Sequence, residues 1–232
     1  MGISEAVETI QERIDRACVR SGRKPEDVRL MGVSKFHGLP AIEEAWSAGI
    51  RLFGESRVQE AVSKFPDFKA AHPGTEIHMI GSLQRNKAKI AAGDFFDAVQ
   101  SVDRDELITT LGALTGDRKN PLIILLEYHT AEDSKSGYPD LDSLFRAAER
   151  ALEFPGLALR GLMTMAPLTG EEAPIRASFK AVVSARDALA IRFPANDWSC
   201  LSMGMSGDFE IAIEEGSTLI RIGTAIFGER NP

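Results

Sequence analysis

The feature that most constrains this chain is a regular alternation of short apolar runs with amphipathic segments. A helix-like segment over residues 1–22 comes first, and eight mostly apolar runs follow it, separated by stretches with helical spacing. The predicted strands are residues 29–35, 50–54, 77–81, 98–102, 122–126, 157–165, 198–203 and 219–222. The predicted helices between and after them are residues 41–48, a segment from 58 onward, 84–92, 104–114, 141–152, 176–191 and 208–215.

Strict alternation of strands and helices implies a parallel sheet with right-handed crossovers. Eight such units within 232 residues predict a single (β/α)8 TIM barrel with an extra N-terminal helix, and a doubly wound open sheet is the alternative. No linker or low-complexity segment interrupts the pattern. We therefore predict that residues 1–232 form one domain, with the helix over 1–22 packed on the barrel.

Charge and cysteine content exclude several classes of function. The formal net charge of −7 argues against binding to nucleic acid or to anionic membranes. No apolar run approaches the roughly 20 residues of a membrane span, and Glu5 and Glu8 lie where a signal peptide would be apolar. The two cysteines, Cys18 and Cys200, have neither metal-ligand nor disulfide-framework spacing. We expect a cytoplasmic protein without a metal site.

The first predicted strand ends on a lysine, Lys35, directly before His37-Gly38 breaks the run. A lysine is costly to bury unless its ammonium is paired or its pKa falls. The special chemistry of lysine is imine formation with carbonyl compounds, including pyridoxal phosphate. Strand ends of a barrel meet at one rim, where working residues gather. Lys35 is therefore a candidate nucleophile, and a solvated loop lysine is the alternative.

An arginine interrupts the last apolar run, which reads Leu219-Ile220-Arg221-Ile222. A closed barrel has no edge strand, so we predict that Arg221 points into the barrel interior. Its guanidinium would act there as a permanently charged hydrogen-bond donor.

The loops after the seventh and eighth predicted strands are rich in glycine and hydroxyl groups. They read Ser202-Met-Gly-Met-Ser-Gly-Asp208 and Gly223-Thr224. In such barrels these two loops commonly bind phosphate, because glycine lets backbone N–H groups approach an anion. Ser202 and Thr224 would add hydroxyl donors. Each loop alone is also consistent with an ordinary turn in which Ser206 or Asp208 caps the next helix.

Seven groups of residues between about residue 28 and residue 230 carry a more specific signal. They are Val33-Ser-Lys35, Phe53-Gly-Glu55 with Val58-Gln-Glu60, His78-Met-Ile-Gly81 with Leu83-Gln-Arg-Asn-Lys87, Ser134-Lys-Ser-Gly137, Arg160-Gly-Leu-Met-Thr164, Leu201-Ser-Met-Gly-Met-Ser-Gly-Asp208 and Arg221-Ile-Gly-Thr-Ala-Ile-Phe-Gly228. Together these motifs resemble the pyridoxal phosphate homeostasis protein family. The resemblance implies a barrel like the N-terminal domain of alanine racemase, without the second domain of that enzyme.

The resemblance also implies a cofactor and its ligands. Lys35 would form an internal aldimine, a Schiff base, with pyridoxal 5′-phosphate, the vitamin B6 cofactor. Arg221 would face the pyridine nitrogen, and Ser202, Gly223 and Thr224 would hold the phosphate.

The sequence departs from the family pattern at two places. Ser56-Arg57 follows Phe-Gly-Glu where the family usually has Asn, and Phe36-His37-Gly38 after the lysine is atypical. We expect His37 to be a loop residue.

The arginine assigned to the ring nitrogen favours binding over catalysis. Many pyridoxal enzymes place a carboxylate there, which keeps the ring a strong electron sink, whereas an arginine cannot accept that proton. Racemases also use a tyrosine from their second domain, and neither Tyr128 nor Tyr138 matches its position. We therefore expect a non-enzymatic protein that buffers pyridoxal phosphate or delivers it to apo enzymes.

Two other functions remain as alternatives. A single-domain pyridoxal-phosphate-dependent amino-acid racemase would use the same site, and a Schiff-base aldolase would use Lys35 without a cofactor. Lys87 and Lys135 are the alternative attachment points. The family resemblance implies a monomer or a weakly associating protein, and we expect a monomer.

Overall fold

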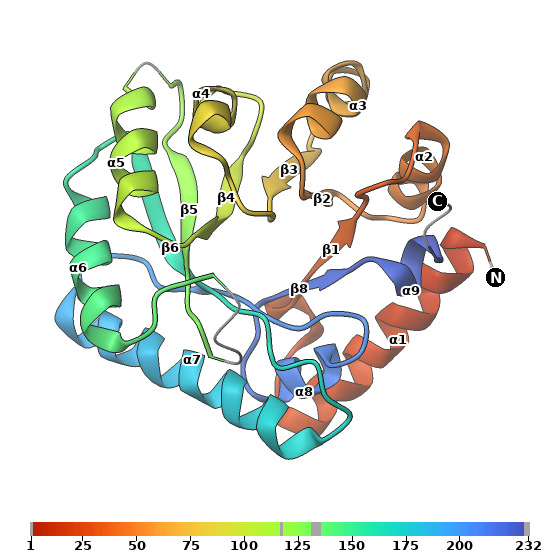
Figure 1. Ribbon diagram of the computed structural model, residues 1–232. Coiled ribbons are helices and arrows are strands. Elements are labelled where there is room, and N and C mark those ends of the chain that lie inside the picture. The colour runs from red at the N-terminus through yellow and green to blue at the C-terminus, as the bar shows by residue number, and fades with distance from the viewer. Residues whose placement is uncertain (1, 117, 131–135, 230–232) are drawn as a thin grey trace.

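In the residues that the computed structural model describes, 2–116, 118–130 and 136–229, eight parallel strands close into a barrel (Figure 1). The strands are β1 (Arg29–Val33), β2 (Leu52–Glu55), β3 (Glu76–Met79), β4 (Ala98–Val102), β5 (Leu122–Glu127), β6 (Leu157–Met163), β7 (Cys200–Ser202) and β8 (Leu219–Ile222). Each strand pairs with the next along the chain, and β8 pairs with β1, where Met31 lies opposite Arg221. The predicted (β/α)8 barrel is confirmed, and the open sheet is excluded.

Helices surround the barrel, as Figure 1 shows. They are α1 (Ile3–Ser21), α2 (Leu39–Ser47), α3 (Val58–Ala71), α4 (Ala88–Ala91), α5 (Asp105–Leu114), α6 (Leu141–Leu152), α7 (Glu172–Arg192), α8 (Phe209–Glu214) and α9 (Thr224–Phe227), with 3-10 turns η1 (Pro25–Asp27) and η2 (Arg85–Lys87). The helix predicted at 84–92 is instead η2 followed by the single turn α4. The sequence does not predict the short helix α9, because four residues carry too little periodicity to indicate a helix.

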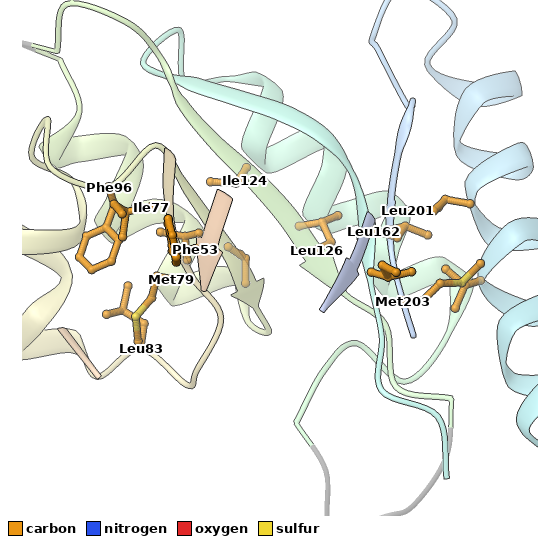
Figure 2. Close-up of a cluster of buried hydrophobic side chains, with 14 of the residues drawn as sticks. Phe53, Ile77, Met79, Leu83, Phe96, Ile124, Leu126, Leu162, Leu201 and Met203 are labelled. Atoms are coloured by element: carbon orange, nitrogen blue, oxygen red, sulfur yellow. The ribbon is translucent and has the colours of Figure 1, made fainter. Parts of the chain in front are cut away.

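The strands are buried on both faces, which explains their nearly continuous apolar sequences. Outward-facing side chains pack against the helices. Figure 2 shows part of this layer, including Phe53, Ile77 and Met79 from β2 and β3. A second, smaller apolar cluster lies inside the barrel. It consists of Met31, Val33, Leu52 and Leu219. This cluster lies beside Arg221, because Met31 pairs with Arg221 across β1 and β8.

Helix α1 packs along α8, α9 and α2, in agreement with Figure 1. It ends at Gly22, which has a left-handed φ of 67° and donates its backbone N–H to the last turn. Ile10 and Ile14 on its inner face are almost completely buried. The helix therefore contributes to the main hydrophobic core.

Replacement of Ile14 by alanine should lower the free energy of unfolding by about 3 kcal/mol, because it removes three buried carbons and leaves a cavity. The matched control is Val19→Ala in the same helix, where the side chain is 78% exposed and the expected change is within about 0.5 kcal/mol. Urea unfolding of both variants measures the difference. Equal stabilities would mean that the barrel does not depend on α1.

Among the described residues, no helix combines the length and the apolar character needed to span a bilayer.

Candidate functional site

The interior of the barrel holds a buried arginine on its last strand. Arg221 is 5% exposed; its Nη1 group donates to the carbonyl and to the hydroxyl of Ser202, both at 2.7 Å, and its Nη2 group donates to the Thr164 carbonyl at 2.8 Å. Burial lowers the pKa of Arg221 to about 10, opposed by Asp208 and Glu127, so the guanidinium stays charged at neutral pH. The predicted inward orientation of Arg221 is confirmed.

The contacts of Ser202 differ from those that the sequence predicts. Ser202 is the last residue of β7 and is fully buried, so its side chain follows the inward face of the strand instead of joining the loop. Its hydroxyl donates to Gln100 Oε1 at 2.6 Å and accepts from Arg221. In this structure Ser202 therefore holds Arg221, and its contact with a phosphate stays a prediction.

A buried carboxyl group lies at the end of β5, and the sequence does not predict it. Glu127 is 3% exposed and accepts a hydrogen bond from the Ser136 hydroxyl at 2.9 Å. Burial raises the pKa of Glu127, and the attraction of Arg221 acts in the opposite direction. The group adds negative charge to the interior that contains Arg221.

The loop that carries Lys35 leaves β1 under unusual restraint. Val33, the last residue of β1, belongs to the interior cluster, and Lys35 follows it in the turn at the end of the strand. Lys35 itself is half-buried. The next residue, Phe36, has a φ of 68°, a left-handed conformation that costs a bulky side chain of order 1 kcal/mol or more.

Helix α3 holds this loop in place. Lys64 Nζ donates to the carbonyls of Ser34 and His37 at 3.0 and 3.1 Å and contacts the carboxylates of Glu55 and Glu60 at 2.8 and 2.9 Å. Glu60 also accepts the backbone N–H of Phe36 at 2.5 Å. Burial raises the pKa of the fully buried Glu55, while Lys64 and Ser34 lower it. These contacts offset the strain at Phe36 and fix the backbone on both sides of Lys35.

Replacement of Glu60 by alanine should lower the free energy of unfolding by about 1.5 kcal/mol, because the Phe36 N–H loses a charged acceptor. Glu60→Gln keeps an oxygen at the same place without the charge, so it should recover roughly half of that loss. Urea unfolding gives the stabilities, and amide hydrogen exchange at Phe36 reports the loop itself. Unchanged exchange in Glu60→Ala would show that Glu60 does not hold the loop.

The two loops predicted to bind phosphate meet at the rim of the barrel. The backbone N–H of Ala225, at the start of α9, donates to Ser206 Oγ at 3.4 Å. Asp208 accepts the backbone N–H of Met205 at 2.5 Å and thereby tightens the loop after β7. Gly223 lies against Val33, and a Cβ at this glycine would approach the Val33 side chain to 3.5 Å.

These contacts place Gly223 and Thr224 at the same end of the barrel as Lys35. Ser206, which the sequence suggests only as a helix cap, instead connects the two loops through Ala225. Because the loops present a hydroxyl, glycine backbone and the first turn of α9 together, their donor chemistry fits an anion such as a phosphate group.

The two departures from the family pattern lie together beside this site. An open pocket of about 610 Å³ is lined by Phe36, His37, Gly38, Arg57, Gln59 and Glu60. The Arg57 guanidinium lies over the Phe36 ring at 5.0 Å. The His37 ring stacks on Phe227 of α9 at 5.1 Å, and burial lowers the pKa of His37. His37 is therefore a packing residue of the loop, as expected.

The alternative attachment point Lys87 lines a different pocket from the one beside the Lys35 loop. Lys87 ends η2 and lines a separate pocket of about 270 Å³ that also includes Arg57 and Gln84. Lys135 lies outside the described residues.

Fold and site together define a single parallel barrel of the alanine racemase N-terminal type, with a restrained lysine after the first strand and a buried arginine in the last. The family model of the alanine racemase N-terminal domain matches residues 7–231. The pyridoxal phosphate homeostasis protein of Vibrio cholerae is 41% identical over 232 residues, covering 99% of this chain and 97% of that protein. The Escherichia coli K12 protein of the same name is 39% identical over 231 residues, covering 99% of this chain and 97% of that protein. The chain belongs to the pyridoxal phosphate homeostasis protein family, which confirms the resemblance seen in the sequence.

Solved structures support the same fold and family. PipY of Synechococcus elongatus, whose structure was determined with PLP bound, is 36% identical to this chain. The match covers 94% of this chain and 100% of PipY, and the two superpose with a TM-score of 0.82. A protein of unknown function from Bifidobacterium adolescentis is 32% identical, with a TM-score of 0.89 over 97% of this chain and 94% of its own. Alanine racemase of Clostridium difficile, at 9% identity and a TM-score of 0.76, shares the fold over 97% of this chain and 57% of its own.

Proposed function

We propose that this chain binds pyridoxal 5′-phosphate reversibly through Lys35 and takes part in pyridoxal phosphate homeostasis. The observation that carries the proposal is the pairing of a restrained Lys35 loop on β1 with a buried, charged Arg221 on the adjacent β8. The 36% identity to PipY, whose structure holds PLP, supports the choice of cofactor. In this proposal residues 1–232 act as one binding domain.

The residues present fit this cofactor. The Lys35 amine condenses with the aldehyde and releases water. Arg221 would face the ring, and Gly223 and Thr224, together with Ser202 or with Ser206 at the joined loops, would hold the phosphate. When bound, pyridoxal phosphate supplies an aldehyde for amines and an electron-withdrawing ring.

Binding without efficient catalysis is the finer part of the proposal. Arg221 already donates three hydrogen bonds and cannot accept a proton from a ring nitrogen. Tyr138 does not act as a proton-transfer group here, because its hydroxyl donates to Asp105 at 3.0 Å and burial raises its pKa. Both features oppose racemase chemistry.

A weak racemase-like activity is the second candidate, because Glu127 is a buried carboxyl group with a raised pKa in the same interior. Exchange of the α-hydrogen of amino acids with deuterium, measured with wild type and Glu127→Gln, separates the two functions. Exchange above that of free pyridoxal phosphate, lost in Glu127→Gln, would favour catalysis.

The cellular setting completes the proposal. We expect a cytoplasmic monomer that passes the cofactor to apo enzymes, consistent with a net charge of −7. Light scattering coupled to size exclusion measures the oligomeric state. Reactivation of an apo enzyme by loaded protein, at a rate different from that with free cofactor, measures transfer.

The decisive experiment is chemical labelling. The protein is incubated with pyridoxal phosphate, reduced with borohydride, digested and mapped by mass spectrometry. We expect the pyridoxyl label on the peptide that contains Lys35. A label mainly on Lys87 or Lys135, or no label at all, would contradict the proposed attachment.

A further inference from the structure

A line of polar side chains crosses the barrel interior from β8 to β3. Arg221 Nη1 donates to Ser202 Oγ at 2.7 Å, and Ser202 Oγ donates to Gln100 Oε1 at 2.6 Å. The Gln100 Nε2 group lies 2.8 Å from His78 Nδ1. His78 Nε2 has no hydrogen-bond partner among the described residues, and the nearest charge to it is Glu76 Oε2 at 3.6 Å, too far for a hydrogen bond. The four residues from Arg221 to His78 are at most 5% exposed, so these groups depend on one another for partners.

The Arg221 end sets the direction of the hydrogen bonds, and the negative charge beyond the other end agrees with it. Arg221 at one end carries only donors. Glu76 at the other end is ionised, because the neighbouring His78 and the Arg29 guanidinium at 2.8 Å lower its pKa to about 2. An ionised carboxylate carries only acceptors. The hydrogen-bond donors therefore point from Arg221 through Ser202 and Gln100 to His78, and the ring of His78 faces the negative charge of Glu76.

This direction fixes the state of the imidazole. Gln100 accepts from Ser202 with its oxygen, so its amide nitrogen faces His78 and donates to Nδ1. His78 must then carry its proton on Nε2, which faces the Glu76 carboxylate. Burial lowers the pKa of His78, which agrees with a neutral ring.

We propose that Gln100 is a positioning residue that sets this direction and thereby holds Arg221 as an oriented donor in the candidate site. The carboxamide suits the task because it accepts on one side and donates on the other. A leucine would leave the Ser202 O–H without an acceptor and His78 Nδ1 without a partner. A glutamate would accept from Ser202 but could not donate to His78. The inference deepens the proposed function and rests on it for the role of Arg221.

Nitrogen NMR of the cofactor-free protein tests the direction by itself. Long-range ¹⁵N–¹H spectra at pH 7 should show His78 as a neutral ring protonated on Nε2, with its signals assigned by their loss in His78→Gln. In Gln100→Glu, two carboxylates flank the ring, and His78 should be protonated on both nitrogens. An Nδ1–H tautomer or an imidazolium in the wild type would overturn the proposal. So would an unchanged neutral His78 in a folded Gln100→Glu variant.

Titration with pyridoxal phosphate tests the positioning. Gln100→Leu should keep Lys35 competent for labelling but bind the cofactor about 10-fold more weakly, because the Ser202 hydroxyl that Arg221 contacts loses the acceptor that fixes its orientation. The bound cofactor should also show a shifted absorption maximum. Arg221 keeps its two carbonyl partners, so the variant should fold.

The matched control is Gln11→Leu on the exposed face of α1, where the side-chain amide donates to Asp15 in the next turn, and this variant should bind as wild type does. Wild-type affinity and spectrum in Gln100→Leu would overturn the positioning role. Failure of the wild type to bind pyridoxal phosphate would instead overturn the proposed function, and the NMR result would still decide the direction of the line.

Discussion

Replacement of Lys35 by alanine should abolish covalent incorporation of pyridoxal phosphate after borohydride reduction. The reason is chemical, since only an amine condenses with the aldehyde. The protein should remain folded, with a change in the free energy of unfolding within about 1 kcal/mol, because Lys35 is half-buried at a rim and not in the core. The absorption band that distinguishes the lysine-bound cofactor from free pyridoxal phosphate should disappear as well.

Two control variants distinguish the loss of the reactive Lys35 amine from the loss of a positive charge. Lys35→Arg keeps the positive charge but has no nucleophilic amine, so it should hold the cofactor only non-covalently and give no label. Lys87→Ala removes a lysine of the neighbouring pocket and should be labelled like the wild type. A Lys35→Ala protein that keeps the label and the spectrum would place the attachment elsewhere, and the loop held by Lys64 and Glu60 would then have no role in attaching the cofactor.

The barrel could be predicted from the sequence because its signal is redundant. Apolar runs such as 122–126 and 219–222 are each ambiguous, but eight of them at regular spacing leave few folds. The predicted boundaries are less accurate. The run predicted to end at Lys35 stops as a strand at Val33, because Phe36 turns the chain into a left-handed conformation. That conformation depends on Glu60 and Lys64, which are distant in the sequence.

The interior polar line is harder to predict, for a physical reason. When both faces of a strand are buried, alternation between apolar and polar residues disappears, and the sequence does not show which side chains point inward. Arg221 stands out because a charge inside an apolar run of a closed barrel has to point into the interior. Gln100 and Glu127 are also polar residues in mostly apolar strands, but they are a weaker indication of an inward side chain. Ser202 reads in the sequence as part of the following loop, although it ends the strand. Polar residues within otherwise apolar strands of a barrel are therefore candidates for one shared interior network.

The largest expected effect on stability is at Gly161 of β6, next to the irregularity in the pairing of β6 with β5. Gly161 has a φ of 148°, which side chains rarely adopt, and a Cβ there would lie 1.9 Å from the carbonyl oxygen of Cys200 on β7. Neither strand can move freely, because the barrel is closed and β7 carries Ser202, which holds Arg221. The clash involves backbone, so no rotamer change relieves it.

Gly161→Ala should therefore lower the free energy of unfolding by more than about 4 kcal/mol or prevent folding, a loss that only a few mechanisms produce. The matched control is Gly170→Ala, where an added Cβ meets nothing within 4 Å and φ is not in the left-handed range; it should leave the stability unchanged or raise it by about 0.5 kcal/mol. Urea unfolding followed by circular dichroism compares the two variants. A Gly161→Ala protein as stable as Gly170→Ala would mean that β6 and β7 do not approach as closely as described. The support that β7 gives to Arg221 would then be in doubt as well, because Ser202 lies on the same strand.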